Sequence, residues 1–291
     1  MEKMSKYSDL YKKGLEALVG AGIADASLDA RLLLEYICGT DHNTLLAHGD
    51  MEIDGEKEAS YMQLIDRRMS REPLAYILGR QEFMGLDFKV SGDVLIPNQD
   101  TETLVEEALR YLQEGMRVLD LCTGSGCIAL SLLNYSNGTE AVGTDISKAA
   151  LAIAEQNAKR LGLDSRYKAY YADLYDIIDE GNGTAGALGK FDIIVSNPPY
   201  IPTGVIEGLE PEVKDHEPFL ALDGKDDGLF FYRKIIDNVQ DYLLSNGWLI
   251  MEIGFDQAEA VKAMMDQKGF KDIQVIRDLG GNDRVVLGTL Y

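Results

Sequence analysis

Short apolar runs alternate with amphipathic segments over the C-terminal two-thirds of this chain. The runs predict strands over 116–121, 140–145, 167–171, 191–196, 247–253, 270–277 and 284–290, and the amphipathic segments predict helices over 101–112, 127–135, 148–161, 226–244 and 256–268. Such alternation is typical of a mainly parallel sheet covered by helices. Only residues 278–283 join the last two strands, and a parallel crossover needs about a dozen residues. The final strand is therefore predicted to be antiparallel.

The first 80 residues have helical spacing and few strand patterns. Ser27 is expected to cap a helix that Gly39 ends, a further helix is expected over 55–70, and another is expected to begin at Pro73. These elements predict a small α-helical domain that precedes the α/β part. Between the two, residues 81–91 alternate like two strands around a turn and predict a β-hairpin. The glycine-rich stretch 181–190 is expected to be a flexible surface insertion.

Length and charge limit the classes of partner. A chain of 291 residues exceeds one typical domain, so two domains are expected. Acidic residues outnumber basic ones 49 to 28, which gives a formal charge of −21. Proteins that bind long nucleic acids usually carry basic stripes that neutralise phosphates, so a basic protein surface is the better expectation. One small basic cluster, Arg67, Arg68 and Arg71, is interpreted as a solvated helix face.

The chain has no obvious export or membrane signal. Residues 1–20 are charged and contain no apolar signal-peptide core, and no apolar run reaches roughly 18 residues. The three cysteines include no C-x-x-C pair, which suits a reducing compartment and argues against disulfides and zinc. The three histidines are scattered, so structural roles are expected for them. We therefore expect a soluble cytoplasmic protein without a metal site.

The most informative local feature is the stretch Asn197-Pro198-Pro199-Tyr200, which directly follows an apolar strand pattern. An Asn side chain offers a carbonyl acceptor, and proline residues offer carbonyls without a backbone N–H. Such a loop suits an incoming –NH₂ group, and Tyr200 adds an aromatic face for a planar amide or base. The alternative is a proline-rich turn after a buried strand, because Asn-Pro is a common turn dipeptide.

A glycine loop upstream has the features of a cofactor site. It comprises Cys122, Thr123, Gly124, Ser125 and Gly126, follows one predicted strand and opens a predicted helix. Glycines permit close backbone approach, and a helix N-terminus offers free N–H donors. Asp145 ends the next predicted strand, where nucleotide-binding α/β units hold ribose hydroxyls with a carboxylate. A solvated Asp at a strand end is the alternative for Asp145 taken alone.

In order and spacing, these elements resemble an S-adenosylmethionine-dependent methyltransferase of the Rossmann-like class. The resemblance implies a class I methyltransferase sheet, mostly parallel with the last strand antiparallel. It also implies that Asp173, after the predicted strand 167–171, lies beside the adenine, whereas a helix N-cap is the alternative for that residue. On this resemblance the cofactor-binding residues are Cys122, Thr123, Gly124, Ser125, Gly126, Asp145, Asp173 and Asn197.

A narrower resemblance extends across nearly the whole chain. The helical N-terminal region, Leu95-Ile96-Pro97 leading to Asp100-Thr101-Glu102, Glu217-Pro218, Glu252-Ile253-Gly254 and 278–286 together resemble the HemK/PrmC family of release factor glutamine methyltransferases. That resemblance implies methyl transfer to the glutamine side-chain amide in the Gly-Gly-Gln motif of class-1 peptide-chain release factors. It implies a recognition domain over 1–80, a hairpin linker over 81–98 and a methyltransferase domain over 99–291. Asn197, Pro198 and Tyr200 would be catalytic, and Asn197, Pro198, Pro199 and Tyr200 would bind the substrate.

The chain departs from that family's pattern at two places. Asn98-Gln99 stands where the family usually has Arg-Pro, which is expected to alter packing on the cofactor side or to remove an ion pair. Cys122 stands where the glycine loop usually begins with Gly. Because a side chain disfavours the left-handed region, the φ angle of Cys122 is expected to be negative.

Three other functions are also compatible with the sequence. A methyltransferase acting on an exocyclic amine of RNA or DNA uses a similar acceptor loop, although the net acidity weighs against it. A ribosomal-protein glutamine methyltransferase shares the loop but not the extended match. A non-catalytic scaffold would have no need of the glycine loop, Asp145 and the acceptor loop together.

Overall fold

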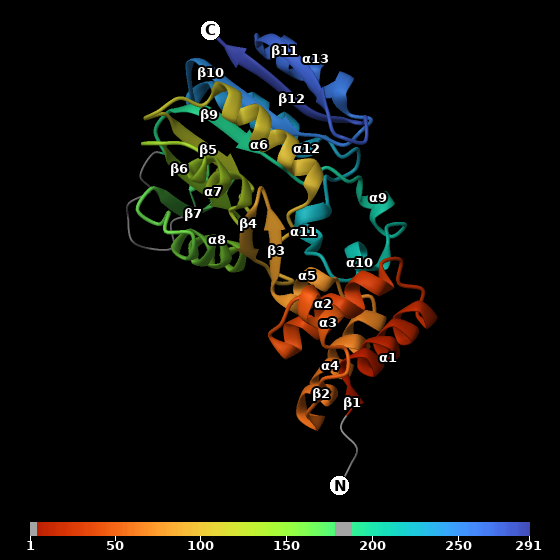
Figure 1. The fold of residues 1–291 in the computed structure, drawn as a ribbon. Helices are drawn as coiled ribbons and strands as arrows, with labels where there is room; N and C mark the ends of the chain where they lie inside the picture. Colours follow the sequence, from red (N-terminus) through yellow and green to blue (C-terminus); the bar gives the residue numbers. More distant parts are fainter. Residues whose placement is uncertain (1–4, 178–187) are drawn as a thin grey trace. The chain divides into compact units, whose positions relative to one another are not determined.

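A computed structural model describes residues 5–177 and 188–291, which form two compact units (Figure 1). One unit comprises Met1–Gly79 with Glu210–His216, and the other comprises Arg80–Leu209 with Glu217–Tyr291. The insertion expected over 181–190 lies largely outside the described residues. The first unit thus takes in a short segment from far along the chain.

The first unit is helical, as predicted. It contains α1 (Tyr7–Gly20), α2 (Ala26–Cys38), α3 (His42–Ala47), α4 (Gly55–Met69), α5 (Leu74–Leu78), α10 (Pro211–Lys214) and a small sheet of β1 (Ser5–Lys6) and β2 (Glu52–Ile53). Helix α2 ends as expected at Gly39, whose φ of 65° is left-handed. It begins after Asp25 rather than Ser27, and the β1–β2 pair was not predicted because two-residue strands are too short to show a period.

The interpretation of the basic cluster as a solvated helix face is wrong. Arg68 is only 8% exposed, and its guanidinium donates to Asp29 at 2.7 Å and to Glu212 at 3.2 Å. Arg71 also forms an ion pair with Glu212, at 3.2 Å, and Arg67 forms a separate ion pair with Glu72. These ion pairs hold the segment 210–216 within the helical unit. The sequence could not show them, because Glu212 lies 144 residues from Arg68.

An eight-stranded sheet forms the centre of the second unit. Its order is β11-β12-β10-β9-β5-β6-β7-β8, with bounds β5 (Arg117–Leu121), β6 (Glu140–Asp145), β7 (Tyr167–Asp173), β8 (Asp176–Ile177), β9 (Phe191–Ser196), β10 (Leu243–Glu252), β11 (Lys271–Arg277) and β12 (Asp283–Leu290). Strands β6, β5, β9 and β10 are parallel neighbours, whereas β12 runs antiparallel to both β10 and β11. The predicted fold class and the antiparallel final strand are confirmed.

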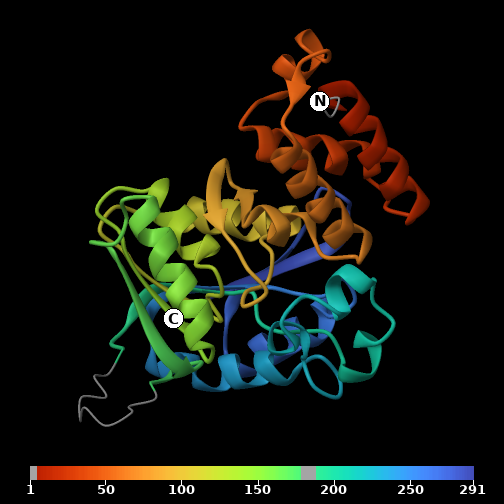
Figure 2. The same cartoon turned by 90° about the horizontal axis from the view of Figure 1, so that it is seen from below.

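Two apolar clusters cover the two faces of this sheet. Along β5, Val118 contributes to one cluster and Leu119 to the other, because successive side chains of a strand point to opposite faces. The first cluster is covered by α6 (Gln99–Tyr111), α7 (Cys127–Asn134) and α8 (Lys148–Arg160), and the second by α12 (Phe230–Asn238) and α13 (Ala258–Lys268). Figure 2 shows these two sets of helices on opposite sides of the sheet.

The predicted hairpin is present as β3 (Arg80–Phe83) paired antiparallel with β4 (Leu86–Lys89). Phe83 and Phe88 are buried in the first of the two clusters, so the hairpin packs into the core of the second unit. The helix predicted over 226–244 is shorter than expected. It ends at Asn238, a 3₁₀ turn covers Val239–Asp241, and β10 then begins at Leu243. Along the chain, the short helices α9 (Thr203–Ile206) and α11 (Phe219–Leu222) come after β9 and before α12.

Within the described part of the chain, no helix combines the length and apolar character needed to cross a membrane.

Candidate active site

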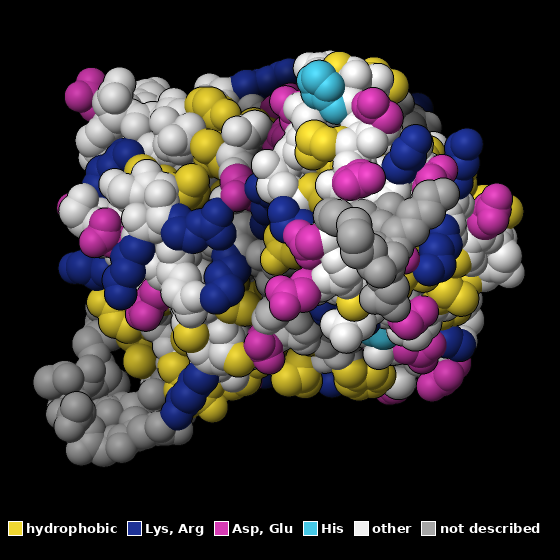
Figure 3. All heavy atoms as spheres, turned by 60° about the horizontal axis from the view of Figure 1, so that its bottom comes forward, with side chains coloured by type: hydrophobic (Ala, Val, Ile, Leu, Met, Phe, Trp, Pro, Cys, Tyr) yellow, Lys and Arg dark blue, Asp and Glu magenta, His cyan; other side chains and the backbone are white. Residues whose placement is uncertain are grey.

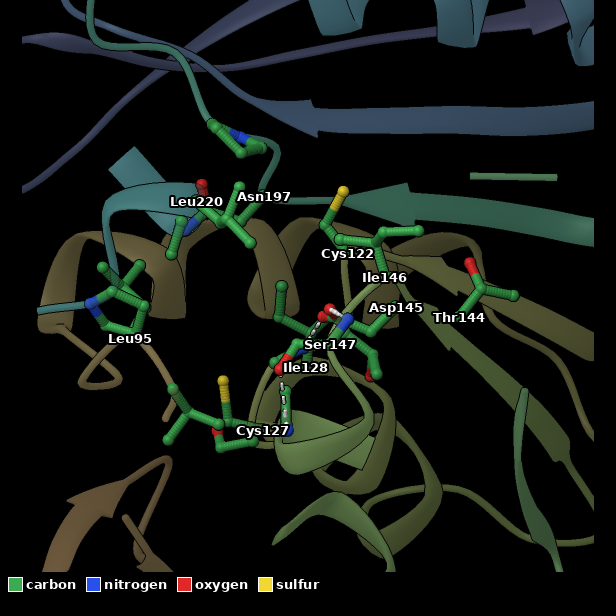
Figure 4. Close-up of a pocket in the computed structure, with 18 of the residues that line it drawn as sticks. Leu95, Cys122, Cys127, Ile128, Thr144, Asp145, Ile146, Ser147, Asn197 and Leu220 are labelled. Atoms are coloured by element: carbon green, nitrogen blue, oxygen red, sulfur yellow. Dashed lines mark hydrogen bonds between the residues drawn. The ribbon is translucent and has the colours of Figure 1, made fainter. Parts of the chain in front are cut away.

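A pocket lies where the chain leaves the carboxyl ends of three neighbouring strands. Strands β5, β6 and β9 end at Leu121, Asp145 and Ser196, and the loops after them line one cavity. Figure 4 shows Cys122, Asp145 and Asn197 around this cavity. Parallel α/β sheets bind ligands at this edge because the loops converge where the strand order reverses. Here the order reverses at β5, with β6 on one side and β9 on the other.

The loop after β5 is wound tightly against the end of β6. The Thr123 N–H donates to the Thr144 carbonyl at 3.0 Å, and the Gly126 N–H donates to the Thr123 carbonyl at 2.8 Å. Gly124 has a φ of 54°, and a Cβ built on it would meet no heavy atom within 4 Å. The backbone at Gly124 therefore faces open space and is available to a ligand. A Cβ at Gly126 would lie 3.2 Å from Ala154, so that glycine permits close packing between α7 and α8.

The expectation for Cys122 is wrong, because its φ is +60°. The bond from the next residue to Thr144 ties the loop to β6, and this tertiary constraint overrides the local preference for negative φ. A side chain in the left-handed region costs about 1–2 kcal/mol. Cys122 thus carries backbone strain at the position where a glycine would carry none.

Because of that strain, two variants that both remove the thiol are expected to differ in stability. We expect Cys122→Gly to have a free energy of unfolding about 1 kcal/mol higher than Cys122→Ala, because only Ala keeps the Cβ at positive φ. Urea denaturation of the two variants measures the difference. An Ala variant as stable as the Gly variant would show that Cys122 is unstrained.

Asp145 is held by the backbone around it. Its Oδ2 accepts from the Gly124 N–H at 2.9 Å, and its Oδ1 accepts from the Ser147 N–H at 2.8 Å. Burial raises the pKa of the Asp145 carboxyl, and these N–H donors act in the opposite direction. Each carboxylate oxygen keeps a further lone pair, so the side chain can still accept hydrogen bonds from a diol. The glycine loop and the carboxylate are therefore one hydrogen-bonded unit.

Asp173 lies at the end of β7 and lines the same pocket. Lys234 of α12 pairs with it at 3.2 Å. The helix N-cap alternative is wrong, because the chain turns after Asp173 and returns as β8, with Asp173 opposite Asp176. Asp173 is thus a pocket residue with a cationic neighbour.

The stretch Asn197-Pro198-Pro199-Tyr200, called the acceptor loop, leaves β9 and presents Asn197 to the pocket. The Asn197 Nδ2 group donates to the Thr101 hydroxyl at 3.2 Å. Pro198 and Pro199 are buried, and the Tyr200 hydroxyl donates to Glu252 at 3.3 Å. Burial beside that carboxyl raises the pKa of the Tyr200 phenol. The loop is therefore anchored at both ends.

The structure brings together most of the site residues named from the sequence. Those that line the pocket are Cys122, Thr123, Gly124, Ser125, Asp145, Asp173, Asn197 and Pro199. Gly126, Pro198 and Tyr200 do not line it. Gly126 packs between two helices, Pro198 lies between the lining residues Asn197 and Pro199, and Tyr200 directly follows them. Among the described residues, no cluster of His, Cys, Asp and Glu side chains has a metal-binding arrangement.

Several pocket residues were missed by sequence reasoning. Ile146, Leu174 and Phe231 supply apolar surface to the lining, together with Leu95, Ile96 and Leu220. Ile146 and Leu174 directly follow β6 and β7, whereas Phe231 and Leu220 lie on α12 and α11. Leu95 and Ile96 belong to the family pattern quoted from the sequence, which gave them no place in a pocket. Thr101 also lines the pocket, from the first turn of α6. From the sequence, Thr101 was placed in an amphipathic helix and in the family pattern, but it was given no role in the site.

Burial raises the pKa of the Asp120, Glu217 and Glu252 carboxyls of this unit to about 7 in each case. Their ordinary values are 3.8, 4.5 and 4.5. Between those values and about 7 the folded protein binds more protons than the unfolded chain. The stabilising contribution is complete below pH 4 and is lost as the pH rises through 7.

We therefore expect the free energy of unfolding to fall as the pH rises from 5 to about 7.5. Carboxyls with a lowered pKa, such as Asp227 at about 2, change protonation below this window. Denaturation at pH 5, 6, 7 and 8 measures the slope, and Asp120→Asn should reduce it relative to wild type. A free energy of unfolding that is constant or rises from pH 5 to 7 would contradict the assignment.

Comparison with known proteins places this architecture in a family. The model of the PrmC N-terminal domain matches residues 9–79, and the model of a methyltransferase domain matches residues 112–278. The chain is 43% identical to the release factor glutamine methyltransferase of Geobacter sulfurreducens over 273 residues, which is 94% of this chain and 93% of that protein. The chain belongs to the release factor glutamine methyltransferase family. A second member, from Clostridium botulinum, is 40% identical and covers 97% of this chain and 99% of its own length.

Solved structures show the same class I methyltransferase fold. A methyltransferase from Pyrococcus furiosus has a TM-score of 0.51 at 17% identity and covers 70% of this chain and 89% of its own. The catalytic domain of hMettl16, solved with the MAT2A 3′UTR hairpin 6, has a TM-score of 0.56 at 17% identity and covers 78% of this chain and 82% of its own. In general, this fold and the methyltransferase domain imply S-adenosylmethionine as the methyl donor.

The departure from the family pattern at Asn98-Gln99 is accommodated at the start of α6. The Asn98 Oδ1 accepts from the Thr101 N–H at 3.0 Å, so Asn98 is the N-cap of that helix. Both Asn98 and Gln99 are exposed and neither lines the pocket. The substitution therefore supplies a helix cap.

Proposed function

We propose that this chain transfers a methyl group from S-adenosylmethionine to the side-chain amide nitrogen of the glutamine in the Gly-Gly-Gln motif of class-1 peptide-chain release factors. The observation that carries the proposal is the position of Asn197. Its Nδ2 group is held by Thr101 while it lines the same pocket as Gly124 and Asp145. The family relatives, which are named release factor glutamine methyltransferases, supply the acceptor.

The polar and apolar groups that line the pocket match the parts of S-adenosylmethionine. We assign its binding to Cys122, Thr123, Gly124, Ser125, Gly126, Asp145, Asp173 and Asn197. Asp145 would hold the ribose hydroxyls, because its carboxylate is fixed in place and keeps free lone pairs. Asp173 would lie beside the adenine, between apolar residues that include Leu174 and Phe231.

The acceptor loop would orient a weak nucleophile. An amide nitrogen shares its lone pair with its carbonyl, so it must be held in line with the methyl group, which the sulfonium supplies already activated. The Asn197 Oδ1 and the Pro198 carbonyl would accept its two hydrogens and stabilise the positive charge that develops on it. Pro199 would keep the loop rigid, and the Tyr200 ring would pack against the glutamine amide.

We further propose that substrate recognition and methyl transfer are carried out by different domains. Residues 1–80 would recognise the release factor, 81–98 would form a hairpin linker, and 99–291 would carry out the transfer. The charge of −21 would speed the encounter with a basic protein surface. A translation factor as substrate would put this protein in the cytoplasm.

Two other methyl acceptors, a nucleic-acid base and a ribosomal-protein glutamine, are the alternatives to the release factor. A base-modifying enzyme would need a basic surface for phosphates. On the face drawn in Figure 3, Lys and Arg side chains are interspersed with Asp, Glu and apolar ones. The likeness to the hMettl16 catalytic domain concerns the fold, at 17% identity. A ribosomal-protein glutamine is the other alternative, and the extended family match favours the release factor over it.

The decisive experiment offers purified release factor, ribosomal protein, RNA and DNA in parallel, each with labelled cofactor. Mass spectrometry of the release-factor digest is expected to show one added methyl group on the Gly-Gly-Gln peptide. Label in RNA, DNA or ribosomal protein alone would replace the proposal with that acceptor. A release factor with Gln replaced by Glu in this motif is the matched negative control.

A further inference from the structure

A chain of buried and partly buried hydrogen bonds links the acceptor loop to β10. The Thr101 hydroxyl donates to the Glu252 Oε2 at 2.6 Å and accepts from the Asn197 Nδ2 at 3.2 Å. The other carboxyl oxygen, Oε1, accepts from the Tyr200 hydroxyl at 3.3 Å. Thr101 is 2% exposed and Glu252 is fully buried. One carboxyl group therefore contacts one end of the acceptor loop directly and the other end through a threonine.

The direction of these hydrogen bonds decides which atom Asn197 offers to the pocket. A threonine hydroxyl has a single hydrogen, and an ionised carboxylate can only accept. The hydrogen of Thr101 points to Glu252, since that contact is shorter than the 3.2 Å to Asn98 Oδ1. Only lone pairs remain on the Thr101 oxygen for Asn197, so its NH₂ group must face Thr101. The Asn197 Oδ1 is thereby kept free to accept.

The surroundings of Glu252 suit a carboxyl that works as an acceptor. Burial raises the pKa of the Glu252 carboxyl to about 7, and the Thr101 hydrogen bond and nearby Arg284 act in the opposite direction by favouring the charged form. Arg284 is itself paired with Asp278 at 3.0 Å and with Asp100 at 3.1 Å. Tyr232 donates to the backbone carbonyl of Glu252 at 3.0 Å and leaves the side chain untouched. Removing a charged carboxyl from water costs free energy, so a contribution to stability does not explain why Glu252 is buried here. Its contacts with both ends of the acceptor loop point to positioning.

We propose that Thr101 and Glu252 are positioning residues for methyl transfer, which set the orientation of the Asn197 amide and of the Tyr200 ring. This inference rests on the proposed function for its kinetic readout. Neither residue touches the reacting atoms. They act by ensuring that the acceptor loop presents an oxygen, and not an NH₂ group, to the incoming amide.

A trio of threonine variants tests the inference. Thr101→Val keeps the shape and removes the hydroxyl, whereas Thr101→Ser keeps the hydroxyl. Thr139→Val is the matched control, because Thr139 is 0% exposed and its hydroxyl has no hydrogen-bond partner in the described part of the chain. We expect Thr101→Val to lower kcat by about 10- to 100-fold with cofactor affinity within about threefold of wild type. Thr101→Ser should recover most of kcat, and Thr139→Val should match wild type.

A second readout does not depend on the substrate. In ¹⁵N-Asn-labelled protein without ligand, one Asn197 side-chain N–H should exchange slowly in wild type and in Thr101→Ser, and rapidly in Thr101→Val. Equal kcat and equal exchange in the Ser and Val variants would overturn the positioning role. If wild-type protein leaves the release factor unmethylated, the proposed function fails, and the exchange result still decides whether Thr101 orients Asn197.

Glu252 has its own test in the pH profile. The charged and titratable groups around its carboxyl include Tyr200, Tyr232, Cys127 and Arg284, with Asp100 beyond Arg284. Protonation would free the Thr101 hydrogen to turn towards Asn197, so wild-type kcat is expected to fall as the pH drops through about 7. Glu252→Gln should flatten this fall, since an amide does not titrate there. An unchanged slope in Glu252→Gln would assign the fall to another group.

Discussion

Asn197→Ala is expected to lower kcat by about 100- to 1000-fold, the loss typical of removing one preorganised hydrogen-bond partner of a developing charge. The variant loses the Oδ1 acceptor that the contact with Thr101 keeps free. An alanine cannot hold the acceptor amide or offset the positive charge on its nitrogen. Methylation of the release factor under saturating cofactor measures this effect.

The control for Asn197→Ala is cofactor affinity. Calorimetry should give a dissociation constant within about threefold of wild type, because the other groups assigned to the cofactor, namely the glycine loop, Asp145 and Asp173, are unchanged. Asn238→Ala is a matched surface control, since that exposed amide donates to the Lys234 carbonyl of its own helix. Turnover of Asn197→Ala within a few-fold of wild type would remove Asn197 from catalysis.

Asp145→Ala is expected to show the opposite pattern, with cofactor affinity lost first. Hydrogen bonds to a charged group contribute about 1.5–3 kcal/mol, so losing those to a diol should weaken binding by roughly 10- to 1000-fold. The variant also removes the acceptor of the Gly124 N–H at 2.9 Å, which loosens the glycine loop. Calorimetric titration with S-adenosylmethionine or S-adenosylhomocysteine measures the change.

Two further variants separate the causes of that loss. Asp145→Asn retains an acceptor for the Gly124 N–H but not the charge, so we expect intermediate affinity. Asp164→Ala, at an exposed position between α8 and β7, should bind the cofactor as wild type does. Affinity of Asp145→Ala equal to wild type would refute the assignment of the ribose to this carboxylate.

Much of the fold could be predicted because its signals are local. The periods of strands and helices located the central elements, and the six-residue connection 278–283 required an antiparallel last strand. The site was predictable to the same extent. Asn197 and Gly124 follow strands and Asp145 ends one, and parallel neighbouring strands bring their carboxyl ends to one edge.

The errors arose where contacts distant in sequence override a local preference. Cys122 takes a positive φ because its loop is bonded to the end of β6. Arg68 is buried because the segment 210–216 belongs to the helical unit. Neither fact leaves a pattern in the residues nearby.

The sequence by itself determined the order of the elements and the positions of the loops at Asn197 and Gly124, because periodicity and turn chemistry act over a few residues. Only the tertiary structure decided how Asn197 is oriented. Thr101 lies 96 residues from Asn197, and Glu252 lies 151 residues from Thr101. The parallel register of β9 with β10, in which Ser196 lies opposite Met251, brings the acceptor loop beside Glu252. The hydrogen bonds that turn the amide oxygen towards the pocket exist only once the sheet has formed.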